Sequence, residues 1–218
     1  MLEGGPPPGC DLAKEPKDSA PCVTELVGVF VSPLGDDTAD GSRNKPVKTI
    51  GKGLELLADR GRVYICEGTY AEAVTLTKTV SLYGGWSCAG GTWAYTGKKP
   101  IVRSAAGSVA LTLKSAKDVV VADIAFEASD ATAKGGSSIA GFAANSSGRL
   151  VRDSFTAGAG QAGEDGPATV AAFSPLVSPT GNSGANPLRY PNPQCIMSAG
   201  GMVLLQHRRA LRVSWASR

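Results

Sequence analysis

The feature that most limits how this chain can fold is a succession of very short β-prone runs that follows residue 60. The runs hold two to five residues, tend to alternate apolar with polar side chains, and are separated by Gly, Lys-Thr or Lys-Asp turns. Runs of this kind, bounded by turn residues, are typical of short strands. They occupy residues 63–65, 74–76, 80–83, 101–102, 110–113, 119–121, 124–126, 139–142 and 150–151.

Two similarities between runs indicate an internal repeat. The run 111–113 and the run after it resemble the run 74–76 and its successor, at offsets of 37 and 39 residues. Residues 120–123 resemble residues 150–153 at an offset of 30. We interpret offsets of 37 to 39 residues as about two coils of a solenoid whose loops vary in length.

A solenoid explains how such short strands reach a stable core. Each coil has inward apolar residues that it cannot bury alone, and stacking the coils creates parallel strands around one continuous core. An antiparallel sandwich should place Asn-Gly or Asp-Gly turns between long alternating runs, and the Asp-Gly pairs at 40–41 and 165–166 lie elsewhere. The sequence therefore predicts an all-β chain, a short right-handed parallel β-helix.

Residues 26–60 carry a different pattern, which we interpret as an N-terminal cap of strand, acidic loop and helix. The strand is expected at 28–32 and the loop at 33–42. A helix over 46–58 is predicted by apolar residues spaced three, four and three positions apart, namely Val47, Ile50, Leu54 and Leu57. This helix would cover the open end of the stack and hide its unpaired strand edges.

The remaining segments differ in composition from the coils. We expect residues 1–25 to form a Pro-rich tether or extended cap, and residues 61–156 to form the coils. Residues 157–218 begin as a Gly-rich loop and continue as an atypical basic tail, whose composition is that of a flexible or disordered segment.

Charge and hydropathy exclude several classes of partner. The net charge is +3, but the last thirty residues hold five arginines and no acids, which leaves 17 bases against 19 acids in residues 1–188. The bases of this main part are scattered, so we expect no nucleic-acid partner. No stretch approaches the roughly 18 apolar residues of a membrane span, and no signal sequence is visible at the start.

Four of the five cysteines lie in the first 90 residues and can form two local disulfides, Cys10–Cys22 and Cys66–Cys88. Four cysteines allow three pairings, and free buried thiols are the alternative. The chain has no Cys-x-x-Cys, and its single histidine, His207, is remote, which argues against zinc. Disulfides point to an extracellular or cell-surface location.

The order of these segments resembles a known family. A strand, an acidic loop, a helix and the run Val63 to Tyr70 follow one another, and the run Val80 to Trp86 continues the likeness. Together they resemble the cap and first coil of pectin-lyase-like parallel β-helix proteins, in particular Gly-rich surface proteins or lipoproteins of myxobacteria. The likeness covers about residues 10–170. The likeness implies a fold and a surface location. It implies no particular function, because the fold hosts lyases, hydrolases, epimerases and inert surface proteins alike.

The acidic loop is a candidate calcium site. Asp36, Asp37 and Asp40 supply hard oxygen ligands close together in the sequence. An EF-hand is excluded, because Val47 stands where its twelfth residue must be Glu. The alternative is a loop whose Asp and Ser side chains bond its own backbone. No other cofactor is expected.

Candidate catalytic carboxylates lie in the coils at Asp123, Glu127, Asp130 and Asp153. Paired carboxylates serve glycoside hydrolysis, but the Gly-His-Gly and Arg-Ile-Lys elements of polygalacturonase-like enzymes are missing. Arg103 or Arg152 could act as the base of a lyase, although no motif marks either. We therefore assign no catalytic residue and interpret these carboxylates as turn and surface groups.

Aromatic residues gather in residues 64–95. Trp86, Trp93 and Tyr95 could stack on sugar rings, or they could pack the junction between cap and coils. The leading hypothesis is a secreted or cell-surface β-helix with a structural or adhesin-like role and no catalysis. The alternative is a carbohydrate-binding or carbohydrate-active β-helix. Extracellular polysaccharide or protein is the expected partner.

Overall fold

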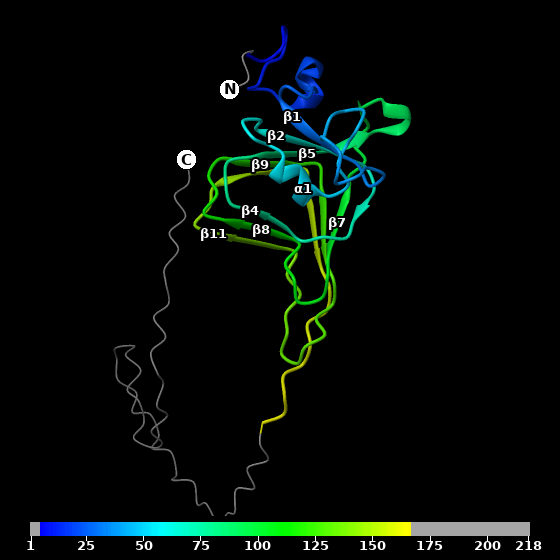
Figure 1. Ribbon diagram of the computed structural model, residues 1–218. Helices are drawn as coiled ribbons and strands as arrows, with labels where there is room; N and C mark the ends of the chain where they lie inside the picture. Colours follow the sequence, from blue (N-terminus) through cyan, green and yellow to red (C-terminus); the bar gives the residue numbers. More distant parts are fainter. Residues whose placement is uncertain (1–4, 167–218) are drawn as a thin grey trace, which may run out of the picture. The chain divides into compact units, whose positions relative to one another are not determined.

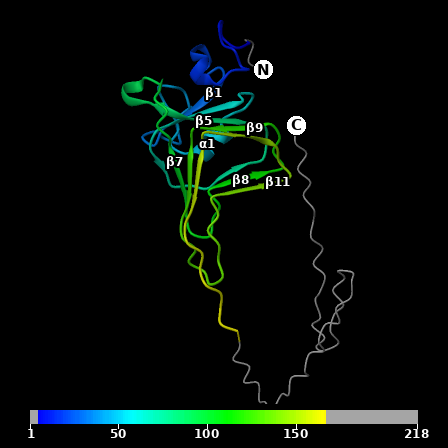
Figure 2. The same cartoon turned by 180° about the vertical axis from the view of Figure 1, so that it is seen from behind.

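The computed structural model describes residues 5–166 and shows a parallel β-solenoid with three sheets (Figures 1 and 2). The first sheet has the order β1 (Gly28–Val31), β2 (Arg62–Cys66), β5 (Ser81–Ser87), β9 (Val119–Ala122) and β12 (Gly148–Val151). The second has the order β3 (Thr69–Tyr70), β7 (Ile101–Ser104), β10 (Ala125–Ala128) and β13 (Ser154–Ala157). The third joins β4 (Val74–Leu76), β8 (Leu111–Lys114) and β11 (Gly141–Ala144). The predicted all-β parallel architecture is confirmed.

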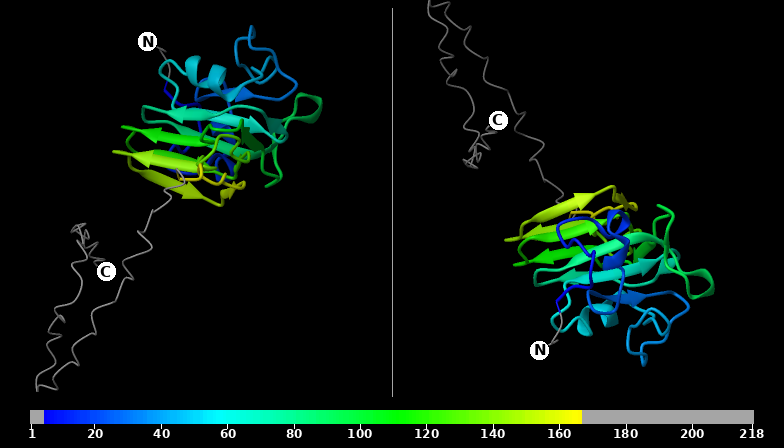
Figure 3. Two further views of the ribbon diagram at one scale, coloured as in Figure 1. Left: turned by 90° about the horizontal axis from the view of Figure 1, so that it is seen from below. Right: turned by 90° about the horizontal axis from the view of Figure 1, so that it is seen from above.

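Each coil adds one strand to each sheet in turn. The first coil runs β2, β3, β4, the second β5, β7, β8, the third β9, β10, β11, and β12 and β13 begin a fourth. Figure 3 shows the strands of successive coils lying side by side. The antiparallel strand β6 (Ala94–Tyr95) pairs with the end of β5 and lies outside this pattern.

The coil-to-coil register corrects the predicted repeat length. Val74 pairs directly with Leu111 and Leu82 with Val121, so offsets of 37 and 39 residues separate neighbouring coils and do not span two. The second coil is long because a loop over 88–100 is inserted between β5 and β7. The next offset is 29, because Val121 pairs with Leu150. The sequence similarity had predicted an offset of 30. The difference of one residue matters, since it exchanges the side chains that face the core with those that face outward.

The first core fills the space between the three sheets. Val63, Leu82 and Val121 are partners in successive strands of the first sheet, and all three are fully buried. Phe126 packs in the same core from the second sheet, and Leu111 from the third. Burying these side chains is the main favourable contribution to folding, at about 25 cal/mol per Å² of apolar surface.

A second core lies on the outer face of the first sheet. Phe30, Tyr64, Tyr83 and Ala122 occupy consecutive paired positions of β1, β2, β5 and β9, and they pack with Trp86 and Trp93. β1 and β2 are therefore buried on both faces.

The cap helix α1 (Ile50–Glu55) is shorter than the predicted helix over 46–58. It begins after Thr49, whose hydroxyl accepts a hydrogen bond from the Lys52 amide at 3.1 Å. Val47 is not helical, because it forms a parallel bridge with Val31. The helix lies against β1, β2 and β4, so it covers the N-terminal end of the solenoid as expected.

The other end of the described solenoid exposes residues that face the core elsewhere. Leu150 pairs with the inward-facing Val121, and Phe155 with the inward-facing Phe126. Both partners are fully buried, whereas Leu150 and Phe155 are 51% and 40% exposed. Within residues 5–166 no further strand pairs with β11, β12 or β13 on this side.

Close stacking of the coils makes Gly84 a sensitive position. A methyl group on Gly84 would collide with the carbonyl oxygen of Asp123 in the next coil and would lie 2.7 Å from Pro100 Cδ. We expect Gly84→Ala to lower the free energy of unfolding by about 1–3 kcal/mol, measured by urea unfolding.

Gly61→Ala is the matched control, because nothing lies within 4 Å of a methyl group placed there. We expect its stability to stay within about 0.5 kcal/mol of the wild type. Equal effects of the two substitutions would contradict the coil spacing described above.

Candidate functional site

The N-terminal segment 5–27 packs against the first sheet and is closed by the disulfide Cys10–Cys22. Tyr64 donates its hydroxyl hydrogen to the carbonyl oxygen of Cys22. Arg62 Nη2 donates to the carbonyl oxygens of Leu12, at 2.7 Å, and Lys14, at 3.1 Å. These hydrogen bonds and the disulfide hold the segment in place on the sheet.

The second predicted disulfide, Cys66–Cys88, is also present, and it holds the inserted loop against the same sheet. Trp93 in this loop donates its ring N–H to the carbonyl oxygen of Arg43 at 3.1 Å, and its ring meets Phe30 edge-on at 4.8 Å. Trp86 meets Tyr64 in a similar edge-on contact at 6.0 Å. The loop therefore completes the second core.

This packing corrects the predicted sugar-stacking surface. Trp86 and Trp93 are 4% and 8% exposed, so neither offers a free ring face to a sugar. Tyr95 is 38% exposed, and its hydroxyl donates to Asp123 Oδ2 at 3.1 Å. Both tryptophans instead pack between the cap and the coils, which was the alternative expectation.

The carboxylates of the acidic loop are directed to separate partners. Asp36 accepts hydrogen bonds from the amide and hydroxyl of Thr38, and Asp40 accepts one from the Ser42 amide. Asp37 accepts from the amides of Lys48 and Thr49 and from the Thr49 hydroxyl. In the described part of the chain no group of three or more His, Cys, Asp or Glu is placed to hold a metal. Calcium binding here stays a prediction.

Hydrogen bonds favour the charged forms of Asp36 and Asp40. The backbone and hydroxyl donors of Thr38 lower the pKa of Asp36, and those of Ser42 lower the pKa of Asp40. The three Asp side chains therefore shape the loop, whatever else they bind.

The candidate catalytic carboxylates are not brought together as a set. Glu127 pairs with Arg103 at 2.6 Å on the second sheet, and Asp130 accepts a bond from the Ala159 amide at 2.7 Å. Asp123 binds the guanidinium of Arg152 at 2.7 and 2.8 Å. Each of these three interactions joins one coil to the next.

Arg152 also ties the N-terminal segment to the fourth coil. Its Nη2 lies 2.6 Å from the carboxylate of Glu15, while Nε and Nη2 both bond Asp123. The hydrogen bonds that Arg152 donates to Asp123 and Glu15 raise the pKa of Arg152. The N-terminal segment thus reaches from β1 to the fourth coil across the outer face of the first sheet.

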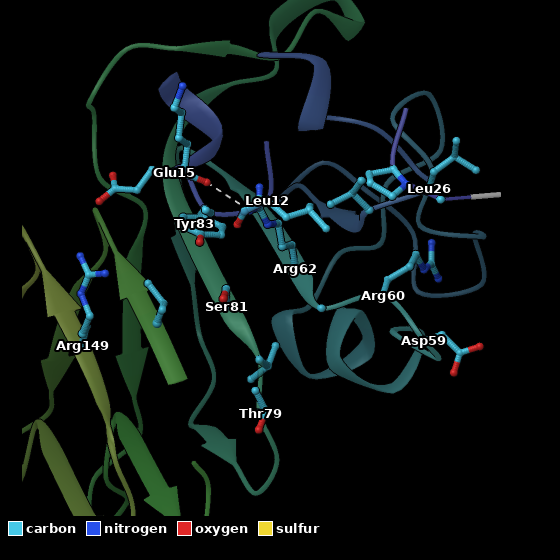
Figure 4. Close-up of a pocket in the computed structure, with 18 residues that line it drawn as sticks. Leu12, Glu15, Leu26, Asp59, Arg60, Arg62, Thr79, Ser81, Tyr83 and Arg149 are labelled. Atoms are coloured by element: carbon cyan, nitrogen blue, oxygen red, sulfur yellow. Dashed lines mark hydrogen bonds between the residues drawn. The ribbon is translucent and has the colours of Figure 1, made fainter. Parts of the chain in front are cut away.

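A groove of about 670 Å³ lies between this segment and the sheet (Figure 4). Its floor includes a single row of paired positions: Arg62 on β2, Ser81 on β5, Val120 on β9 and Arg149 on β12. Residues of the N-terminal segment and of the turn before β5 form the walls. No local sequence pattern marks this site, because the four floor residues lie far apart in the chain.

The groove carries an uncompensated buried charge. Arg62 is 6% exposed, no carboxylate among residues 5–166 forms an ion pair with it, and its Nη1 has no hydrogen-bond partner. Its guanidinium carbon lies 5.4 Å from the centre of the Tyr83 ring, a cation–π contact that offsets part of the burial cost. Buried charges are usually paired, so this one marks the groove as a candidate anion site.

These features define a class of protein: a parallel β-solenoid whose N-terminal segment and inserted loop are held by disulfides over one sheet. The model of a family described as protein of unknown function (DUF1565) matches residues 34–157. The match spans more than half of the chain, which therefore belongs to this family of parallel β-helix type. Among curated proteins and solved structures, none matches this chain.

Some of the residues discussed in the sequence lie outside the part of the chain that the structure describes. Cys195, His207 and the basic tail beyond residue 166 lie outside the described residues. Within residues 5–166 no helix is both long and apolar enough to cross a membrane.

Removing the second disulfide should destabilise the fold. Cys66 and Cys88 are 22 residues apart, and closing a loop of that size contributes about 3 kcal/mol. We expect the double variant Cys66→Ala/Cys88→Ala to unfold at correspondingly lower urea concentration. Its tryptophan emission should shift to the red as Trp86 and Trp93 gain access to water. Unchanged stability would contradict the assigned structural role of the bridge.

The carboxyl group of Asp153 should make the stability of the fold depend on pH. Burial raises the pKa of Asp153 to about 7 and the nearby Asp123 adds to the rise, although the amides of Ile124 and Val151 bond the carboxylate and oppose it. This pKa is above the value of about 3.9 in the unfolded chain. Between these two pKa values the folded protein therefore binds the proton more readily than the unfolded chain does. Stability should therefore fall as the pH rises from about 4 to 7.

The measurement compares urea midpoints at pH 4.5 and 7.5 for the wild type and Asp153→Asn. We expect the wild type to lose more stability than the variant between these two pH values. Equal losses in the two proteins would show that Asp153 has an ordinary pKa.

Proposed function

We propose that this protein is secreted or displayed at the cell surface and acts there as a non-catalytic interaction module of the adhesin kind. The observation that carries the proposal is the groove on the first sheet, because one of its walls is the segment that Cys10–Cys22 closes. A binding surface built on a disulfide suits an oxidising compartment.

The family likeness supports the location. The resemblance of the cap and first coil to pectin-lyase-like surface proteins agrees with a chain that works outside the cytoplasm, and the family match agrees with a parallel β-helix. Neither assigns a reaction, since one fold serves many functions.

Carbohydrate binding is the second candidate function. Tyr95 supports it, because this residue is 38% exposed and lies beside the Asp123–Arg152 pair. A ring of this kind, apolar with a polar tip, suits contact with a sugar.

Thiol labelling of intact cells tests the location. Cells that express the full chain would be treated with a membrane-impermeant protease and, separately, with a maleimide before and after reduction. We expect surface cleavage, and we expect Cys10, Cys22, Cys66 and Cys88 to react only after reduction. Free thiols in a protease-protected protein would overturn the proposal.

Binding arrays test the role. The purified chain would be applied to immobilised polysaccharides and extracellular proteins, with and without calcium, and the supernatants analysed by mass spectrometry for products. We expect binding to protein and no product. Binding to a polysaccharide would favour the second candidate, product release would overturn the non-catalytic assignment, and a calcium requirement would point to Asp36, Asp37 and Asp40.

A further inference from the structure

We infer that the groove on the first sheet binds an extended acidic peptide of a partner protein, with two carboxylates four residues apart and an aliphatic side chain midway between them. This inference rests on the proposed interaction role and names the ligand of the same groove. It follows from the charge of the groove, from the spacing of its arginines and from the chemistry of its walls.

The charge of the groove favours an anion. Arg62 and Arg149 make no ion pair within residues 5–166, and the Arg60 guanidinium bonds backbone carbonyl oxygens. Of the two acids in the lining, Glu15 is bound by Arg152. Figure 4 shows Arg149 and Arg60 on opposite sides of Arg62, so positive charge extends along the groove.

The spacing of the arginines selects the geometry of the ligand. Arg62 and Arg149 occupy one row, with the strands of Ser81 and Val120 between them. Three steps of about 4.8 Å between neighbouring strands place their backbones about 14 Å apart. An extended peptide advances about 3.4 Å per residue, so residues four apart are separated by about 14 Å and point to the same side.

The walls favour a peptide over a sugar. The lining includes Leu12, Leu26, Val27 and Val120. The one aromatic side chain in it, Tyr83, is 7% exposed and lies beneath Arg62. Branched aliphatic side chains can bury an aliphatic side chain of a ligand. In the extended peptide the residue midway between the carboxylates faces Ser81 and Val120, the middle of the row.

The experiment measures fluorescence anisotropy of labelled peptides with the full chain. The probe is acetyl-Gly-Glu-Ser-Leu-Ser-Glu-Gly-amide, which has carboxylates four residues apart. One control replaces both Glu by Gln, and a second permutes the residues so that the carboxylates are two apart. We expect both controls to bind at least about tenfold more weakly, a difference of about 1.4 kcal/mol, and binding of the probe to weaken with added salt.

A matched pair of variants locates the site. Arg149 is exposed, so Arg149→Gln should fold normally, and we expect it to bind the probe at least about tenfold more weakly. Arg103→Gln removes the same charge from an exposed arginine on β7, away from the groove, and should bind the probe as the wild type does.

Several outcomes would overturn the inference. They are no binding of the probe, equal binding of the probe and its Gln control, and unchanged binding by Arg149→Gln. Preferred binding of a linear oligo-uronate, added as a competitor, would assign the groove to acidic glycans instead. None of these results would alter the thiol labelling or the absence of products, so failure of this inference is distinguishable from failure of the proposed function.

Discussion

The parallel pairing of successive coils in the first sheet is the constraint on which the rest of the structure depends. Its register places Val63, Leu82 and Val121 in one inward row and Arg62, Ser81, Val120 and Arg149 in an outward row. The inward row forms part of the core, and the outward row forms the floor of the groove. Because side chains alternate strictly along a strand, one register determines both.

The outer face of this sheet explains the two disulfides that the structure shows within residues 5–166. A narrow solenoid has one buried side to each sheet, whereas here Phe30, Tyr64 and Tyr83 require a cover on the other side. The N-terminal segment and the inserted loop supply it, and both are short irregular pieces with little secondary structure of their own. Cys10–Cys22 and Cys66–Cys88 reduce the entropy lost when such pieces become ordered. The groove is the gap that this cover leaves above Arg62.

Candidate sites differed in how well local sequence could reveal them. The disulfides joined cysteines close in sequence and were predictable from that proximity. The aromatic cluster was visible as a cluster, but the burial of Trp86 and Trp93 depends on Phe30 and on the Arg43 carbonyl, far away in the chain. The groove left no local signal, because its floor takes one residue from each of four coils.

The sequence by itself determined the kind of fold, because strand length, alternation and turn residues are local properties that each coil repeats. The spacing of Ile50, Leu54 and Leu57 also predicted a helix before the coils. In the structure, however, Leu57 lies beyond the end of the helix at Glu55, and Val47 forms a bridge with Val31 that only the folded chain provides. Tertiary structure decided how many residues make a coil and which residue faces which, because these depend on hydrogen bonds between strands separated by loops of unequal length. It likewise decided that Arg62 would be buried without a carboxylate, since burial and charge pairing are properties of the assembled coils.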